Sequence, residues 1–135
     1  MTNDIIKNNE QRLLDRLSEL VELSEYKISS QANSTLTMLF WQIGKDINDF
    51  ILGNHRAEYG KQIMSSVSRY LTQKYGNNFE LRNLRRMRQF AEQFTDLEIV
   101  STLSTQLSWS HFVELLPIKK EEAKLFYAQK SIEGN

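Results

Sequence analysis

Apolar residues recur at spacings of three and four through most of the sequence, which is the periodicity of amphipathic helices. This pattern predicts a first helix over residues 4–28 and a central core helix over residues 35–52. The polar stretch between them, residues 29–34, is either a bend or short break, which we favour, or part of one continuous helix. No segment alternates with a period of two over the length of a strand. The pattern therefore predicts an all-α domain of five to seven helices.

Glycine and polar capping residues mark the helix ends in the middle of the chain. A helix is expected from near Ala57 to Tyr75. Gly76 should end it, because glycine adopts the left-handed cap conformation at low cost. Asn77 lies three residues before Glu80, which is the spacing of a capping pair at the start of the next helix. A helix, a short turn and a second helix in this order form the outline of a helix-turn-helix.

The C-terminal third is predicted to form three more short helices. The pair Thr95-Asp96 is typical of an N-cap. Ser108 is a second expected N-cap, and Pro117 should end the helix that it begins. A last helix is expected over residues 118–130, and residues 131–135 should form a mobile tail.

Length and composition indicate one small domain. The chain has 135 residues, enough for a single hydrophobic core, and its first residues, 1–12, are polar enough to fray. It contains no cysteine, which removes disulfides, thiolate zinc sites and a cysteine nucleophile together. No basic segment leads into an apolar core, and no apolar run approaches about 18 residues. We therefore expect a cytoplasmic protein with no membrane partner.

The strongest two-sided pattern lies between Tyr75 and Phe94. On a helical projection Leu84, Met87 and Phe90 fall on one side, and the opposite side is basic. Arginine presents a planar fork of donors that suits phosphates and guanine edges, and glutamine can pair with adenine. The aromatic residues nearby fall on the buried side, so stacking on single-stranded bases is not favoured, and duplex DNA is the preferred partner, with RNA left open. The residues expected to face a DNA groove are Arg82, Arg85, Arg86 and Gln89.

Further cations surround this helix in the sequence. Residues 55–90 contain eight Lys/Arg against two Asp/Glu, a net +6, whereas residues 1–54 and 91–135 each stand at −3. A charge block of this kind focuses a local field although the whole chain is neutral. A solvated basic face is the alternative interpretation, because arginine and glutamine are also good helix formers. The residues expected to bind phosphates are Lys61, Arg69, Lys74 and Arg88.

Nothing in the sequence resembles a complete active site. His55 and His111 are isolated, with no second histidine or cysteine at a metal-ligand spacing. Carboxylate pairs such as Asp46 and Asp49 lie on amphipathic helices, where they are usually solvated. The glycines are scattered singly and form no phosphate loop. We expect no catalytic residue, no metal site and no cofactor.

Four motifs follow one another along the chain. The first is Phe40-Trp41-Gln42-Ile43-Gly44-Lys45, and the second is Arg56-Ala57-Glu58-Tyr59-Gly60-Lys61-Gln62-Ile63. The third is Phe79-x-x-Arg82-Asn83-Leu84-Arg85-Arg86-Met87-Arg88-Gln89-Phe90, and the fourth is Leu107-Ser108-Trp109-Ser110-His111-Phe112. Together they resemble the N-terminal domain of the YhcG family, and the resemblance extends over residues 13–127.

This resemblance implies a bacterial protein in which a helical N-terminal domain is followed by a nuclease domain of the restriction-endonuclease-like type. That second domain would supply the acidic metal ligands and the catalytic lysine, and no Asp followed by Glu-x-Lys occurs here in a strand-like context. The chain is thus expected to be an excised domain or a short stand-alone relative without nuclease activity. It departs from the family at Glu80, where serine or threonine is commoner, and a carboxylate there would repel an approaching phosphate.

The leading hypothesis is a non-catalytic module that binds duplex DNA through its basic helix and delivers a linked nuclease. Electrostatic association would come first and base recognition second. The main alternative is a protein–protein interaction domain or a homodimer. In that case Arg85 and Arg86 would pair with carboxylates such as Asp46 and Asp49 of a second chain.

Overall fold

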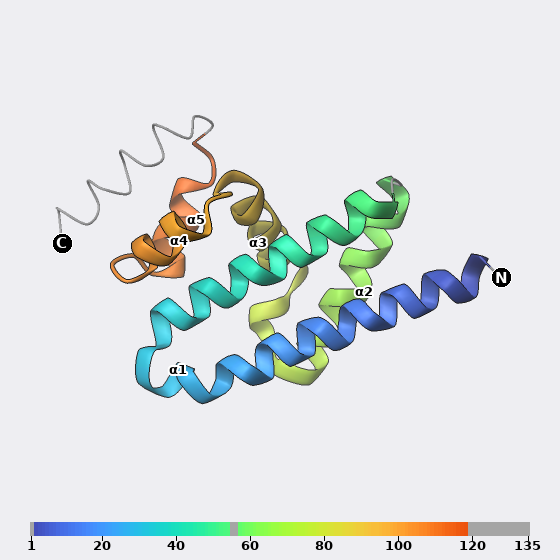
Figure 1. Ribbon diagram of the computed structural model, residues 1–135, viewed down its shortest axis with the longest axis horizontal. Coiled ribbons are helices and arrows are strands. Elements are labelled where there is room, and N and C mark those ends of the chain that lie inside the picture. Colours follow the sequence, from blue (N-terminus) through green and yellow to red (C-terminus); the bar gives the residue numbers. More distant parts are fainter. Residues whose placement is uncertain (1, 55–56, 119–135) are drawn as a thin grey trace.

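The computed structural model describes residues 2–54 and 57–118, and within them it contains only helices and their connections (Figure 1). The all-α prediction and the expected number of helices are confirmed over this part of the chain. The predicted last helix, residues 118–130, lies outside the described residues except for its first residue. The predicted tail, residues 131–135, lies wholly outside them. The elements are α1 (Thr2–Asn54), α2 (Ala57–Tyr75), the 3₁₀ helix η1 (Asn77–Phe79), α3 (Leu81–Gln93), α4 (Leu97–Ser104) and α5 (Trp109–Leu115).

Helix α1 doubles back on itself. A straight helix of 53 residues would be about 80 Å long. Instead, the Arg16 guanidinium lies 3.1 Å from the carboxylate of Asp46, thirty residues further along. Figure 1 shows the two arms returning alongside each other. Ser24 and Ser34 line one groove, so the reversal lies between them. We call residues 2–24 the N-terminal arm and residues 34–54 the C-terminal arm.

The predicted bend at residues 29–34 therefore falls within this reversal. Helix α1 nevertheless continues through the reversal, so the two predicted helices form one bent element. The expected fraying of residues 1–12 stays a prediction.

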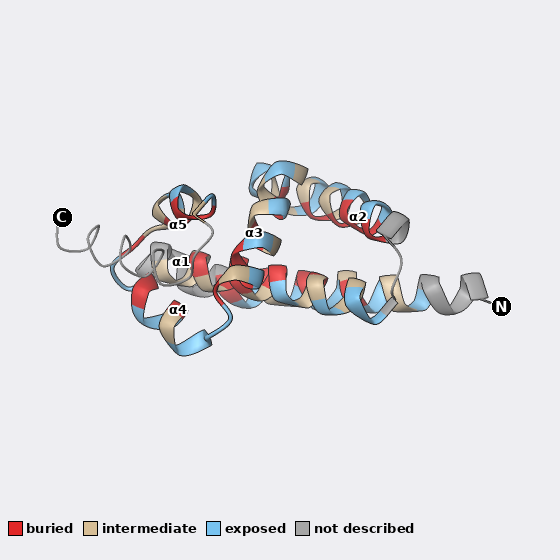
Figure 2. Cartoon of the chain, turned by 90° about the horizontal axis from the view of Figure 1, so that it is seen from above, coloured by how far each residue is buried: buried red, intermediate tan, exposed pale blue. Residues whose placement is uncertain are grey.

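The described residues form two core clusters, and α3 contributes to both. Leu84 and Met87 of α3 pack with the two arms of α1, with α2 and with Phe79. Phe90 of α3 and Phe94, the residue after its end, pack with α4, α5 and Trp41. Figure 2 shows the buried positions of α1 and α2 facing each other. The apolar side predicted for residues 81–94 is thus the buried side, which leaves the basic side of α3 facing outward.

The C-terminal arm of α1 contacts the backbone of α3 directly. A β-carbon on Gly44 would overlap the carbonyl oxygen of Met87. One turn later, Asn48 Nδ2 donates a hydrogen bond to the carbonyl oxygen of Arg88 at 2.9 Å. One turn earlier, the buried Trp41 Nε1 donates to the carbonyl oxygen of Phe94 at 2.7 Å. The spacing of three and four places these residues on one face of α1, and they fix the position of α3.

The connection between α2 and α3 differs from its prediction at one residue. Gly76 has a φ of +103°, as expected for a glycine after a helix. Asn77, however, does not cap α3, because it begins η1 instead. The residue before α3 is Glu80, whose side chain makes no capping hydrogen bond. The physical reason is Phe79, which is buried against the rings of Phe40 and Tyr75 and draws the preceding residues into the 3₁₀ turn.

The last two described helices begin as predicted. Asp96 Oδ1 accepts hydrogen bonds from the backbone nitrogens of Glu98 and Ile99, at 2.9 and 3.4 Å. The backbone nitrogen of Ser108 donates to Nδ1 of His111 at 3.1 Å, within a capping box that opens α5. His111 therefore has a structural partner at the start of its helix. Helix α5 ends at Leu115, two residues before Pro117.

Candidate nucleic-acid interface

The outward side of α3 holds cations that are not neutralised within the described part of the chain. Arg82 and Arg85 are exposed, and Arg86 is half-buried. Ion pairs among the described residues join Arg16 to Asp46, Lys45 to Asp49 and Lys74 to Glu22, and none involves an arginine of α3. Because α3 is packed on its other side by both core clusters, these guanidinium groups project from a fixed helix. A fixed, unneutralised positive face is the arrangement that attracts a polyanion.

A groove between α2 and α3 brings predicted cations from both helices together. Lys61 of α2 lines it with Arg85 and Arg88 of α3, around a volume of about 560 Å³. No carboxylate is among its described lining residues. We call it the α2/α3 groove. Its other lining residues are Ile51, Gly60, Met64, Ser65 and Leu81.

Arg88, which also lines the α2/α3 groove, is half-buried. Its Nε donates a hydrogen bond of 2.6 Å to Oδ1 of Asn48 on α1. Partial burial lowers the pKa of the Arg88 guanidinium, since desolvation disfavours the charged form, and the nearby Glu92 opposes this. Arg88 therefore connects the α2/α3 groove to α1. No local sequence signal indicates the role of Asn48, because its partner is forty residues away.

Gln89 is exposed like Arg82 and Arg85, but its side-chain amide has a partner within the domain. Its Nε2 donates a hydrogen bond of 3.2 Å to the carbonyl oxygen of Leu116, just after α5. Contact with an adenine edge through this nitrogen would require the hydrogen bond to break. Gln89 thus differs from the outward arginines, which have no ion-pair partner among the described residues.

Arg69 and Lys74 of α2 also lie apart from the α2/α3 groove. Arg69 is exposed but is not among the residues lining the groove. Lys74 Nζ donates a hydrogen bond of 2.8 Å to Oγ of Ser18 and lies 3.6 Å from Glu22. The hydroxyl of Tyr75 lies 2.6 Å from the same Ser18 Oγ. This group, Ser18, Glu22, Lys74 and Tyr75, ties the N-terminal arm to the end of α2.

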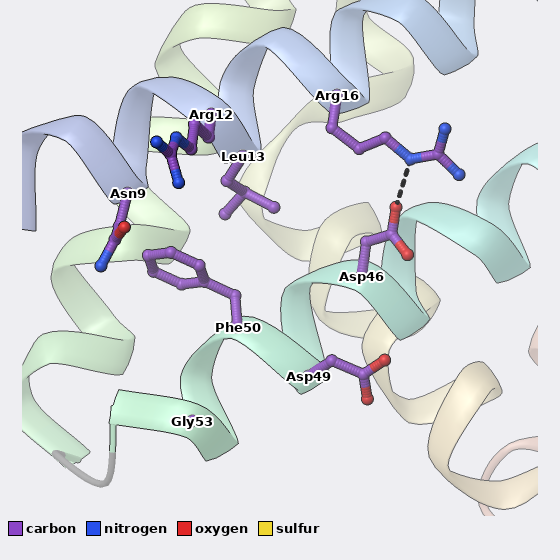
Figure 3. Close-up of a pocket in the computed structure, with 8 residues that line it drawn as sticks. All are labelled: Asn9, Arg12, Leu13, Arg16, Asp46, Asp49, Phe50 and Gly53. Atoms are coloured by element: carbon purple, nitrogen blue, oxygen red, sulfur yellow. Dashed lines mark hydrogen bonds and ion pairs between the residues drawn. The ribbon is translucent and has the colours of Figure 1, made fainter.

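A charged pocket between the two arms of α1 was not predicted. Arg12 and Arg16 of one arm and Asp46 and Asp49 of the other line a volume of about 600 Å³, and Figure 3 shows Arg16 and Asp46 pointing toward each other. Asp46 uses both carboxylate oxygens internally, one with Arg16 and one with Gln42. No local sequence signal could have revealed this site, because its two sides are some thirty residues apart in the chain.

The family model for the DUF1016 N-terminal domain matches residues 16–135. The chain belongs to this family. The match includes every outward arginine of α3 and all described lining residues of the α2/α3 groove. It also confirms the family resemblance that the four sequence motifs indicated.

One curated relative of this DUF1016 N-terminal domain is named "Putative nuclease YhcG", from Escherichia coli (strain K12). The two are 27% identical over 152 aligned positions, which take in 90% of this chain. The chain spans about 40% of the length of that relative. No solved structure matches the chain.

The described residues contain neither a cluster of metal ligands nor a helix that could span a membrane. Within residues 2–54 and 57–118, no three histidine, cysteine or carboxylate side chains gather closely enough to bind a metal ion. None of the described helices combines the length and the apolar character needed to cross a bilayer.

The group of Ser18, Glu22, Lys74 and Tyr75, which we call the Lys74 cluster, should make the stability of this DUF1016 domain change with pH in the alkaline range. Desolvation lowers the pKa of Lys74, but the interactions with Tyr75 and Tyr70 outweigh it and raise the net pKa above the ordinary 10.5. A raised pKa contributes stability below the unfolded-state value, and that contribution disappears as pH rises through the folded-state value. Lys74→Met should therefore be less stable than the parent at pH 8, and the difference should shrink above about pH 10.5.

Urea unfolding at a series of pH values checks this prediction. Lys45→Met, which removes an exposed lysine outside the cluster, is the control. A stability difference between Lys74→Met and the parent that stays constant from pH 8 to pH 11 would show that the raised pKa of Lys74 is not its cause.

Proposed function

We propose that this domain binds duplex DNA through the outward side of α3 and positions a linked nuclease on it, without itself performing catalysis. The observation that carries the proposal is the set of Arg82, Arg85 and Arg86 on one fixed helix, unpaired with any described carboxylate. The nuclease link rests on similarity to the longer E. coli protein named "Putative nuclease YhcG".

In this proposal α2, the turn and α3 act as a helix-turn-helix. The second helix of such a motif enters the major groove with its first residues near the base edges. The outward arginines lie in the first two turns of α3. Arginine forms bidentate hydrogen bonds with guanine and charge-assisted bonds with phosphate, so both readout and affinity would come from these residues.

Self-association through Arg85 and Arg86 has less support. In that alternative, Arg85 and Arg86 would pair with Asp46 and Asp49 of a second chain. Both oxygens of Asp46 already accept hydrogen bonds, and Asp49 pairs with Lys45. A dimer of that kind would have to break these bonds before it formed new ones.

Fluorescence anisotropy of a labelled random-sequence duplex tests the proposal. The parent domain should bind, and its affinity should fall steeply with salt because phosphate contacts release counterions. Arg82→Ala/Arg86→Ala should weaken binding at least about tenfold at low salt and reduce the salt slope by about 2, the value for two lost phosphate contacts.

The control removes the same charge elsewhere. Arg12→Ala/Lys45→Ala changes two exposed cations on α1 and should leave most of the affinity. Equal losses of DNA affinity in the two double variants would show that binding depends on net charge alone, and would overturn the proposal. So would the absence of binding by folded protein at low salt. A mass that rises with protein concentration and is indifferent to DNA would favour the interaction module.

A further inference from the structure

The α2/α3 groove has more positive charge than is needed to bind one phosphodiester of a continuous DNA strand. Lys61, Arg85 and Arg88 all line it, and its described lining includes no carboxylate. An internal phosphodiester offers one negative charge, whereas a phosphomonoester has a charge of about −1.5 to −2 at neutral pH and three strong acceptor oxygens. Three converging cations therefore match the monoester better.

Arg88 adds an independent reason to expect an anion in the groove. Its guanidinium is half-buried, it forms no ion pair with a described carboxylate, and the nearby Glu92 offsets its desolvation only in part. Its known hydrogen bond uses Nε, on the side of Asn48. A partly desolvated cation is stabilised when an anion takes the place of lost water. The lowered pKa of Arg88 has the same cause.

The remaining lining of the groove suits the same ligand. Ser65 is exposed and can donate its hydroxyl hydrogen. Gly60 is the fourth residue of α2, so the groove lies at the end of that helix where the backbone dipole is positive. Ile51, Met64 and Leu81 supply apolar surface. The volume of about 560 Å³ falls within the range of small-molecule sites, large enough for a terminal nucleotide.

We propose that the α2/α3 groove binds the terminal phosphomonoester of a nucleic-acid strand. A concave site admits the end of a strand, whereas Arg82 and Arg86, which do not line the groove, would meet the continuous backbone. This inference rests on the proposed DNA binding and adds a preference for phosphorylated ends. Hydrolysis of a phosphodiester leaves such an end on one side of the break, so a domain with this preference would remain at sites where strands have been cut.

Binding of three DNA hairpins tests the proposal. They share one sequence and differ only at the strand end, which is a 5′-phosphate, a 3′-phosphate or unphosphorylated. The parent domain should bind one phosphorylated hairpin at least about fivefold more tightly than the unphosphorylated one, through the additional charge-assisted hydrogen bonds. Lys61→Met should reduce this ratio to below about twofold. Millimolar inorganic phosphate should also reduce it, because free phosphate offers the same chemistry.

Arg82→Ala separates this inference from the proposed function. Arg82 does not line the groove, so its loss should weaken binding of all three hairpins and leave the ratio between them unchanged. Equal affinity of the parent for all three hairpins would overturn the inference while the DNA-binding proposal stands. A ratio that Lys61→Met leaves intact would place the end preference elsewhere and also overturn it. Failure of every hairpin to bind would remove the proposed function itself.

Discussion

Replacing Gly44 with alanine should lower the free energy of unfolding by about 3 kcal/mol, the upper part of the range for overpacked cores. A β-carbon at this position would overlap the Met87 carbonyl oxygen and closely approach the Arg88 nitrogen. Both atoms belong to the backbone of α3, so no flexible side chain can move aside. Relief requires α3 to shift away from the C-terminal arm of α1, which would also strain the hydrogen bonds between Asn48 and Arg88.

Chemical unfolding of Gly44→Ala and Gly53→Ala measures this effect against a matched control. A β-carbon on Gly53, in the last turn of the same helix, would meet no atom within 4 Å. Alanine is also the better helix former, so Gly53→Ala should leave stability unchanged or raise it by up to about 1 kcal/mol. Similar stability changes in the two variants would contradict the close approach of α1 and α3.

Replacing Phe90 with alanine should cost about 4 kcal/mol, within the range for large-to-small changes of buried aromatic residues. The Phe90 side chain is fully buried. Its ring centroid lies 4.8 Å from that of Phe112, 5.3 Å from that of Trp109 and 5.4 Å from that of Phe94. Truncation would therefore leave a cavity where α3 meets α5 and would remove three aromatic contacts at once.

Thermal and urea unfolding of Phe90→Ala, Phe90→Leu and Leu52→Ala test this prediction. Leucine refills part of the cavity, so Phe90→Leu should lose clearly less stability than Phe90→Ala. Leu52 is 70% exposed, and its replacement should change stability by no more than about 0.5 kcal/mol. A loss below about 1 kcal/mol for Phe90→Ala would show that this cluster does not anchor α3.

These two changes and the arginine replacements act on opposite sides of α3. Gly44 and Phe90 determine whether the helix is fixed, whereas Arg82 and Arg86 are placed so that their loss leaves the core intact. A loss of DNA binding in Arg82→Ala/Arg86→Ala with unchanged unfolding free energy would therefore separate recognition from folding.

Features that are encoded over a few neighbouring residues could be predicted from the amino-acid sequence. The apolar spacing of Leu84, Met87 and Phe90 defined the buried side of α3 before any partner was known. Gly76, Asp96 and Ser108 marked helix ends because a cap depends on atoms within about four residues. Four ordered motifs also indicated the family. The failure at Asn77 shows the limit, since the distant Phe40 and the neighbouring Tyr75 hold Phe79 and displace the expected cap.

Which polar residues have partners within the domain, and which remain available for a ligand, depends on how the helices pack. Helical spacing placed Gln89 with the outward arginines and grouped Lys74 with other phosphate-binding cations. The fold gives Gln89 a partner 27 residues away and Lys74 one 56 residues away. It likewise brings Lys61 to the groove that Arg85 lines. Such pairings depend on how α1 reverses and how closely α3 packs against it. These are properties of the packed chain, because residues far apart in sequence interact only once folding has brought their helices together.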